Sequence, residues 1–378
     1  MTAPPPIGEP ERRQRLAALR AAMDAAGIAA TVLGSTESLR YFTGLVWGPS
    51  ERLTGAVVTA TGLAYLCPGF ERSRVESLPI LPGAIATWEE EEDPHALVGD
   101  LVGPVGRIAL DEHLPLFAWH GFVRALGADR LADAAPLVRP LRARKSPAEL
   151  ALIGHAMRLT LGVHKEAHAQ LRPGVRASEI AAFIDARHRA LGADGGSTFC
   201  IVSFGAATAL PHGADGDQVL EPGQLVLVDT GCRLDGYHSD LTRTYSLDTP
   251  DPDAARLWQI HHEAQAAAFA AARPGIPCEA VDAAARAVVE AHGLGPGYRL
   301  PGLPHRTGHG LGLDIHEPPN LVRGDRTPLA RGMCFSCEPM LVMPGRFGIR
   351  LEDHFHMGGT GPVWFTSPQP SLTEPFSD

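Results

Sequence analysis

The chain has 378 residues, of which 44% are hydrophobic and 20% are charged, and its formal net charge is -10. This composition is typical of a globular protein, and the length predicts two domains. The acidic balance, with no basic stripe, argues against nucleic-acid binding. The sequence shows neither a signal pattern nor an apolar stretch that could span a bilayer, so we expect a cytoplasmic protein with no membrane partner.

The first part of the chain predicts a small α/β domain. An amphipathic helix is expected over residues 11–26, ended by Gly27, and a strand over 29–33. Further strands are expected over 54–59, 62–67 and 107–111, alternating with helices near 70–77, 94–102 and 114–127. A boundary near 145 then gives two domains, 1–145 and 146–378. Ser146 and Glu149 form a capping box with proline at the first helical position, so a new helix begins there and runs to about Leu171.

Beyond this boundary the sequence repeats itself weakly. An Arg-Pro-Gly motif at Arg172 and again at Arg273 leads into a helix, and in each copy an acid, Asp229 or Glu338, later follows a glycine by six residues on an apolar strand. Two copies packed about a pseudo-twofold axis would turn these two acids toward one centre.

Two aspartates lie in a predicted β-hairpin around the turn dipeptide Asp235-Gly236. Asp229 is expected to end the first strand, and Asp240 to lie inside the second. Surface or turn acids are the ordinary interpretation of such residues. An acid that closes an apolar run would, however, be buried and would need a cation or a metal as its partner.

Four acids and one histidine form the candidate metal site. Asp229, Asp240, Glu338 and Glu352 supply oxygen ligands, while His309 lies between glycines that let the backbone approach a ligand. Imidazole is an acceptable ligand for Mn, Co, Fe or Zn. Five such ligands suit two divalent metal ions about 3.5–4 Å apart that share a water.

Further candidates surround these ligands. Arg350 and Glu352 are two apart on a predicted strand and share a face, so Arg350 is expected to form a salt bridge, to contact substrate, or both. His212, His305 and His316 are candidate site residues because three histidines accompany the metal-ligand motif. The other histidines are interpreted as surface or structural residues, including His261, His262, His354 and His356. Cys334 and Cys337 form a C-x-x-C pair in an apolar strand, which predicts buried structural cysteines and no zinc or redox pair.

These residues stand in motifs that resemble a known family. The motifs are Val-Asp-Thr-Gly (228–231), Asp-Leu-Thr-Arg-Thr (240–244), His-Arg-Thr-Gly-His-Gly-Leu-Gly-Leu-Asp-Ile-His-Glu (305–317), Cys-Glu-Pro-Met (337–340) and Ile-Arg-Leu-Glu-Asp (349–353). They resemble the pita-bread dinuclear metallopeptidases, above all the Xaa-Pro dipeptidases (prolidases) and Xaa-Pro aminopeptidases. Residues 39–44 are similar to the creatinase-type N-terminal domain of the same proteins. The resemblance implies an α/β creatinase-like domain followed by an α+β pita-bread domain with an internal pseudo-twofold repeat.

The resemblance also implies roles for single residues. It makes Asp229, Asp240, His309, Glu338 and Glu352 the ligands of two divalent ions, manganese first and zinc or cobalt as alternatives. A metal-bridged hydroxide would attack the carbonyl of an N-terminal Xaa-Pro bond.

Around that carbonyl, His316 would donate to the oxyanion and Glu338 would carry the proton to the leaving nitrogen. His212, His305 and Arg350 would line the proline side, and His212 and His305 would also be transition-state contacts.

Several alternatives remain open. A dipeptidase would close the site beyond proline, with Arg52 of a neighbouring subunit in a homodimer as the candidate cation, whereas an Xaa-Pro aminopeptidase would leave it open. Some pita-bread proteins are metal-free binding modules, and creatinase-type amidinohydrolases also work without metal, but here all five ligands are present. Methionine aminopeptidases generally lack the N-terminal domain.

Overall fold

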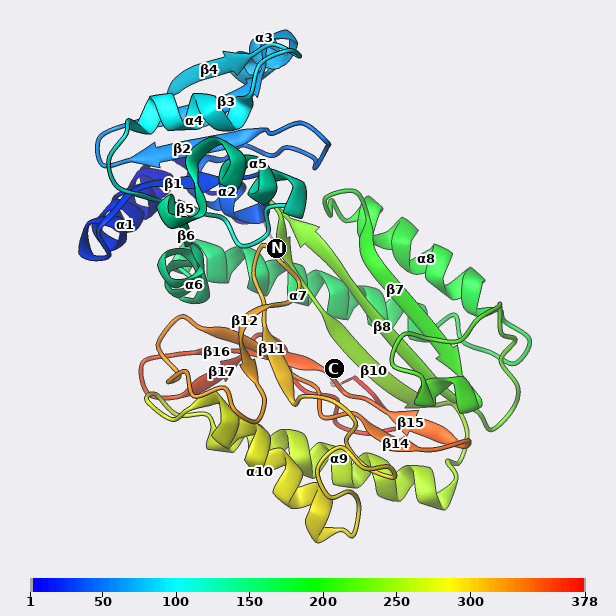
Figure 1. The fold of residues 1–378 in the computed structure, drawn as a ribbon. Coiled ribbons are helices and arrows are strands. Elements are labelled where there is room, and N and C mark those ends of the chain that lie inside the picture. The colour runs from blue at the N-terminus through cyan, green and yellow to red at the C-terminus, as the bar shows by residue number, and fades with distance from the viewer. Residues whose placement is uncertain (1–2, 377–378) are drawn as a thin grey trace. The chain divides into compact units, whose positions relative to one another are not determined.

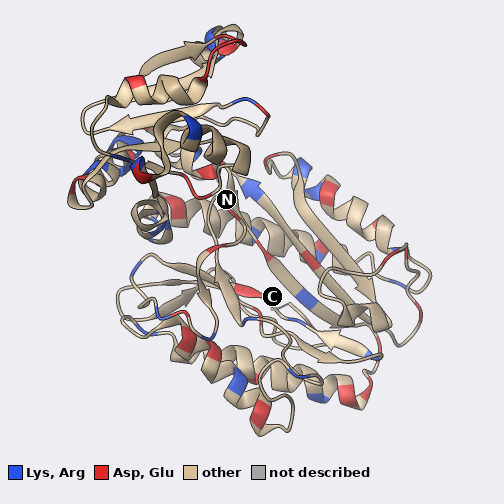
Figure 2. Ribbon diagram, in the orientation of Figure 1, with Lys and Arg blue, Asp and Glu red and all other residues tan. Residues whose placement is uncertain are grey.

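The chain divides into two compact units in the computed structural model, which describes residues 3–376 (Figure 1). One unit is Ile7–Arg142, and the other is Ala143–Asp378 together with Met1–Pro6. Acidic and basic residues are interspersed over the helices and loops of both units (Figure 2). Within residues 3–376, no helix combines the length and the apolar character that crossing a membrane requires.

The unit Ile7–Arg142 is built on one mixed six-stranded sheet with helices packed on it. Its elements are α1 (Glu9–Ala25), β1 (Ile28–Leu33), α2 (Glu37–Thr43), β2 (Gly55–Thr59), β3 (Leu63–Pro68), η1 (Gly69–Glu71), α3 (Arg72–Ser77), β4 (Ala84–Trp88), α4 (Pro94–Val102), β5 (Arg107–Leu110), α5 (Leu116–Leu126), η2 (Ala128–Arg130), β6 (Leu131–Asp133) and α6 (Ala135–Ala143). The strand order is β4-β3-β2-β1-β5-β6. Apolar side chains of β1, β2 and β5 pack against those of α4 and α5 to form the core.

Most predicted elements of this unit are present within two residues of their expected ends. The first helix ends before Gly27, whose φ of 64° a side chain would strain. Four α-helices and strands were not predicted: α2, β4, β6 and α6. These are short, and α6 carries Pro140 inside it, so neither periodicity nor composition marked them.

The unit that begins at Ala143 opens with the predicted capping box. Ser146 Oγ accepts a hydrogen bond from the Glu149 backbone N at 3.2 Å, and the Glu149 carboxylate accepts one from the Ser146 N at 2.9 Å. The helix that follows, α7 (Pro147–His168), ends three residues earlier than expected.

This second unit consists of two halves of similar construction. The first half holds α7, α8 (Ala177–Ala190), β7 (Ser197–Phe204), η3 (Gly205–Ala209), β8 (Leu225–Leu234), β9 (Tyr237–His238) and β10 (Leu241–Ser246). The second holds α9 (Pro252–Ala271), α10 (Cys278–Ala291), β11 (Gly308–Gly310), β12 (Glu317–Leu321), β13 (Cys334–Cys337), β14 (Leu341–Met343), β15 (Phe347–Ile349), β16 (Asp353–Met357) and β17 (Pro362–Trp364).

Each half folds two helices over antiparallel strands and has its own apolar core (Figure 1). The sheets have the orders β10-β8-β7 and β12-β11-β13-β16-β17, with β14 and β15 as a separate pair.

The two halves share a backbone frame, which is a glycine turn held by one backbone hydrogen bond before the second helix of each half. The Gly174 N donates to the Leu220 O at 2.8 Å, and in the second half the Gly275 N donates to the Leu329 O at 2.8 Å. Both glycines have positive φ, 90° and 85°. The same backbone conformation therefore serves the same bond twice, which confirms the expected internal repeat.

The predicted hairpin exists, but its acids lie elsewhere along the strands. Asp235 and Gly236 form the turn with φ of 46° and 78°. β8 continues to Leu234, so Asp229 lies in the middle of the strand and not at its end. Asp240 lies in the break between β9 and β10, not inside a strand. The reason is β9, which pairs with the far end of β8 and extends the hairpin beyond the apolar run.

Cys334 and Cys337 are buried on β13, and neither forms a disulfide. Burial raises the pKa of the Cys334 thiol to about 12, so it is protonated and unreactive at neutral pH. The interpretation of these residues as structural cysteines is confirmed.

Candidate metal centre

A cavity of about 730 Å³ lies in the unit that begins at Ala143. Nine of the ten site residues proposed from the sequence line it: His212, Asp229, Asp240, His305, His309, His316, Glu338, Arg350 and Glu352. The tenth, Arg52, belongs to the other unit. The two halves of the repeat thus contribute to one site.

Each half delivers one acid from within or directly after a strand and one from directly before a strand. Asp229 lies in β8, and Asp240 precedes β10, while Glu338 follows β13 and Glu352 precedes β16. An isolated bridge joins the two halves, because the Glu352 N donates to the Thr242 O at 2.9 Å. All four carboxylates are 9% exposed or less. The acids that are far apart in sequence therefore face one buried point.

His309 lies on β11, between two glycines that have a packing function. A Cβ at Gly308 would lie 2.0 Å from the Ser336 carbonyl oxygen. A Cβ at Gly310 would lie 2.3 Å from the Glu317 carbonyl oxygen of the backbone. The glycines therefore admit neighbouring strands, whereas the sequence had suggested an approach to a ligand. Because the His309 Nδ1 is 3.0 Å from the Gly310 O, Nδ1 donates to that carbonyl and Nε2 is turned toward the acids.

The distances around the His309 Nε2 are short enough for a shared cation. Glu338 Oε1 is 3.2 Å away, and both Asp240 Oδ2 and Glu352 Oε1 are 3.8 Å away. Burial would raise the pKa of Glu338, but the hydrogen bond and charge of His309 outweigh it and hold that pKa below its ordinary value. Burial and a neighbouring carboxylate raise the pKa of Asp240 and of Glu352.

Arg350 is the cation that the cluster already contains. Its guanidinium forms a salt bridge with Asp229, and its Nε donates to the Thr242 Oγ1 at 3.1 Å. That hydroxyl in turn donates to the Glu352 Oε2 at 2.8 Å. One of the two roles expected for Arg350, the salt bridge, is thus present, and the same side chain lines the cavity.

The donor set fits divalent cations. Asp229 Oδ1, Asp240 Oδ1 and Glu352 Oε1 are buried and have no hydrogen-bond partner among the described residues. Four buried carboxylates face one arginine, so further positive charge is needed to offset the desolvation of the acids. Carboxylate oxygens with an imidazole nitrogen suit Mn, Co or Zn.

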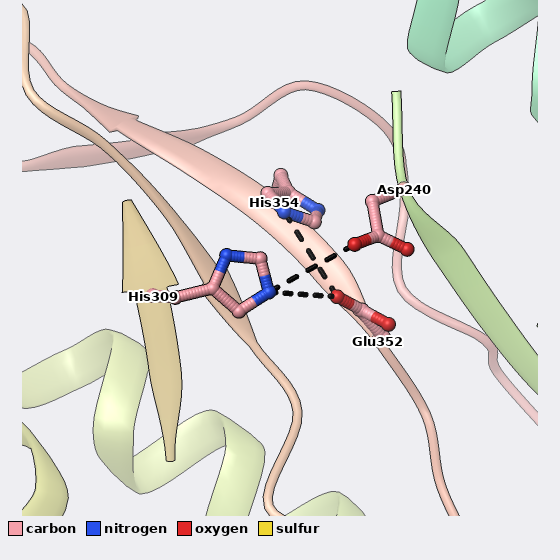
Figure 3. A group of neighbouring side chains, drawn as sticks. All are labelled: Asp240, His309, Glu352 and His354. Atoms are coloured by element: carbon pink, nitrogen blue, oxygen red, sulfur yellow. Dashed lines mark ion pairs between the residues drawn. The ribbon is translucent and has the colours of Figure 1, made fainter. Parts of the chain in front are cut away.

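A histidine that the sequence analysis set aside also belongs to this cluster. His354 is fully buried on β16, and its ring faces Glu352, Asp240 and His309 (Figure 3). Burial excludes the surface position for His354, and the structural role stays an untested interpretation. The available signal was its spacing from Glu352, because residues two apart on a strand share a face.

The three other predicted histidines occupy the cavity wall. The ring of His316 packs edge-on against that of His309, with centroids 4.2 Å apart. His305 is half-buried and its Nδ1 lies 2.6 Å from the Arg306 O, while burial lowers its pKa. His212 is exposed at the cavity. The structure therefore brings these side chains to the acids and leaves their chemical roles as predictions.

Arg52 lies in the unit Ile7–Arg142, in the loop before β2. Its Nε donates to Glu90 at 2.9 Å, and its guanidinium also pairs with Glu51. Its proposed contact with substrate stays a prediction.

Other residues of the cavity wall were not predicted. The apolar ones are Phe199, Ile201, Pro211, Pro304 and Ile315. Arg306 is a half-buried cation whose Nη1 donates to the Asn320 Oδ1 at 3.0 Å. Its place next to His305 in the motif was the only signal for it.

Comparison with known proteins gives two family matches. The model of metallopeptidase family M24 matches residues 151–358, and that of the creatinase/prolidase N-terminal domain matches residues 15–144. The probable dipeptidase PepE of Mycobacterium tuberculosis is 37% identical over 348 residues, covering 90% of each chain.

Solved structures are also similar to this chain. Dipeptidase PepE from Mycobacterium ulcerans has a TM-score of 0.90 at 34% identity, covering 98% of this chain and 99% of that one. Xaa-Pro dipeptidase from Bacillus anthracis has a TM-score of 0.84 at 25% identity, covering 96% and 99%.

Proposed function

Because this chain belongs to metallopeptidase family M24 and carries the creatinase/prolidase N-terminal domain, we propose that it is a dipeptidase that cleaves Xaa-Pro dipeptides. The resemblance seen in the motifs and the expected fold class are confirmed by these matches. The chain is therefore an enzyme, a peptidase. The preference for proline and the number of metal ions are part of the proposal.

The observation that carries the proposal is the buried cluster on one cavity wall. Asp229, Asp240, His309, Glu338 and Glu352 would hold two divalent cations, manganese first and zinc or cobalt as alternatives. When bound, the cations would supply Lewis-acid activation of a carbonyl and would lower the pKa of a water molecule. We assign residues 146–378 to the catalytic domain on this basis.

The chain's own residues would handle the protons. Glu338, which faces His309 in the cluster, would accept a proton from the attacking water and pass it to the leaving proline nitrogen. His316 and His212, on the same wall, would donate hydrogen bonds to the carbonyl oxygen as negative charge develops there.

The rest of the cavity suits the leaving group. Phe199, Ile201 and Pro211 give the wall an apolar stretch that fits a pyrrolidine ring. Arg306 lies on the same wall and forms no ion pair with any residue in the described part of the chain, so it would pair with the free carboxylate of a dipeptide. His305 and Arg350 would line this side.

Two substrates test the dipeptidase proposal directly. We expect manganese-loaded protein to cleave Ala-Pro at least about tenfold faster, in kcat/KM, than Ala-Pro-Ala, because the tripeptide places no carboxylate beside Arg306. Faster cleavage of the tripeptide would instead support an Xaa-Pro aminopeptidase. Ala-Ala serves as the control for proline preference, and equal cleavage of Ala-Ala and Ala-Pro would remove that part of the proposal.

The Arg306→Met variant separates two sources of the carboxylate contact. It should lose most of the preference for Ala-Pro over Ala-Pro-Ala, whereas Arg52→Met should lose it only if a neighbouring subunit of a homodimer supplies Arg52. Sedimentation of the purified protein tests the homodimer.

A metal-free binding module is the candidate from another class. Protein purified with manganese present that contains no metal and hydrolyses neither Ala-Pro nor Ala-Pro-Ala would favour it. The buried, unpaired carboxylate oxygens favour the peptidase.

A further inference from the structure

The feature outside the five proposed ligands is His354 on β16. Its side chain is 0% exposed, and neither Nδ1 nor Nε2 has a hydrogen-bond partner within residues 3–376. Buried polar side chains are as a rule hydrogen-bonded. An imidazole with two unpaired nitrogens therefore requires an explanation.

Three other histidines of the second unit are equally buried, and each has a partner. His164 pairs with the Tyr245 hydroxyl at 2.7 Å and with the Leu241 O at 3.1 Å. His188 pairs with the Thr160 and Ser197 hydroxyls, and His261 accepts from the Leu351 N at 3.1 Å. Each of these three rings thus has at least one paired nitrogen, whereas His354 has none within the described residues.

The unpaired ring faces the candidate metal centre (Figure 3). One ligand atom from each of Asp240, His309, Glu352 and His354 lies within 4.8 Å of the other three. The His354 Nε2 is 3.9 Å from Glu352 Oε1, as the His309 Nε2 is 3.8 Å from the same oxygen. Two ligands each about 2.0–2.2 Å from one ion are at most about 4.4 Å apart, so both separations allow a shared ion.

The strand explains why the ring faces this way. Glu352 and His354 are two apart and share a face, whereas Asp353 between them turns to the opposite side and pairs with Arg243 at 2.6 Å. The neighbouring strand places Ser336 opposite His354, and the Ser336 Oγ lies 3.2 Å from Glu338 Oε1. The Asp240 backbone also lies beside the ring, but it does not reach hydrogen-bond geometry with either nitrogen within residues 3–376.

We propose that His354 is a further metal ligand, which binds one of the two cations together with Asp240, His309 and Glu352. This inference rests on the proposed metal-dependent function. One cation would then have two imidazole ligands and the other mainly carboxylates. Since imidazole nitrogen favours Co and Zn over the harder Mn, the two positions should differ in metal preference.

Cobalt alone is the probe for the test, and the first measurement uses the wild-type protein. Proton NMR of the full chain loaded with Co²⁺ should show two exchangeable, strongly shifted imidazole N–H signals, one each from His309 and His354. A single such signal in a protein that binds cobalt would overturn the inference and leave the proposed function intact. A chain that binds no divalent cation would overturn both.

Two matched variants then assign the second signal. His354→Phe keeps a planar side chain but removes both nitrogens, and His356→Phe is the control two residues further along β16, where the ring packs on Phe365. We expect His354→Phe to lose one shifted signal, to change the visible absorption of bound Co²⁺, and to weaken one of the two binding steps at least about tenfold. His356→Phe should match the wild type. Equal spectra and affinities in all three proteins would contradict the assignment.

Discussion

The two halves of the second unit share a backbone frame but supply different ligand chemistry. In the first half, Asp229 and Asp240 contribute only carboxylates to the cavity. The second half contributes Glu338 and Glu352 and adds the imidazole of His309. The frame is repeated because it satisfies the same backbone hydrogen bonds, whereas the side chains that it carries are free to differ. The repeated backbone therefore places the candidate ligands, while the side chains at those places differ between the halves.

The same comparison separates two uses of a buried histidine. In the first half, His164 and His188 are buried and fully hydrogen-bonded within their core. In the second half, His309 points its Nε2 at carboxylates, with Glu338 Oε1 3.2 Å away. Burial is alike in both cases, so the partner distinguishes a packing histidine from a ligand.

The largest expected effect comes from removing one acid from each half. Asp240→Asn should lose bound metal and lower kcat/KM for Ala-Pro by more than about 100-fold while leaving the fold largely intact, because a metal ligand contributes more than the residues that support it. Glu352→Gln, the counterpart in the second half, should behave alike. Metal analysis, hydrolysis assays and circular dichroism measure this, and full activity in either variant would refute the shared site.

The next effect concerns a buried salt bridge between the two halves. Lys145, just before α7, forms a buried salt bridge with Glu317 at the start of β12, with side chains 2% and 7% exposed. Lys145→Met removes the cation of this buried salt bridge from the Glu317 carboxylate, so the free energy of unfolding should fall by about 3–5 kcal/mol. Urea unfolding measures this. The double variant Lys145→Met/Glu317→Gln should recover part of the loss, and a single variant as stable as the wild type would show that the pair does not join the halves.

Low pH should lower the free energy of unfolding through His164 in the first half. Burial lowers the pKa of this histidine to about 3. An unfolded histidine has a pKa near 6.5, so the unfolded state binds the proton first and stability falls as the pH drops below about 6.5. Between pH 6.5 and 5 this histidine should cost about 1.7 kcal/mol. His164→Asn should flatten the pH dependence of the unfolding free energy by that amount, and an unchanged slope would contradict the assignment.

The smallest effect tests the repeat itself. Gly174 and Gly275 have φ of 90° and 85°, and a Cβ at either position would meet no atom within 4 Å. Alanine there adds backbone strain without a clash, so each variant should lose about 1 kcal/mol, and the two losses should be equal. Thermal unfolding measures both. Clearly unequal losses would show that the two halves use these turns differently.

Several local features of the fold could be predicted from residue type and spacing. The capping box at Ser146, the turn at Gly236 and the repeated Arg-Pro-Gly motifs each depend on a few neighbouring residues, so the sequence alone predicted them. The short elements α2, β4, β6 and α6 were missed because tertiary packing sustains them and local pattern does not mark them.

The sequence by itself determined the two-domain length, the repeat and the set of acids with His309. Only the tertiary structure decided which other side chains reach those acids. His354 was dismissed and lies beside the candidate ligands. The physical reason is that a ligand position depends on strand pairing between residues more than 100 apart, such as Thr242 with Glu352, and no local pattern encodes that pairing.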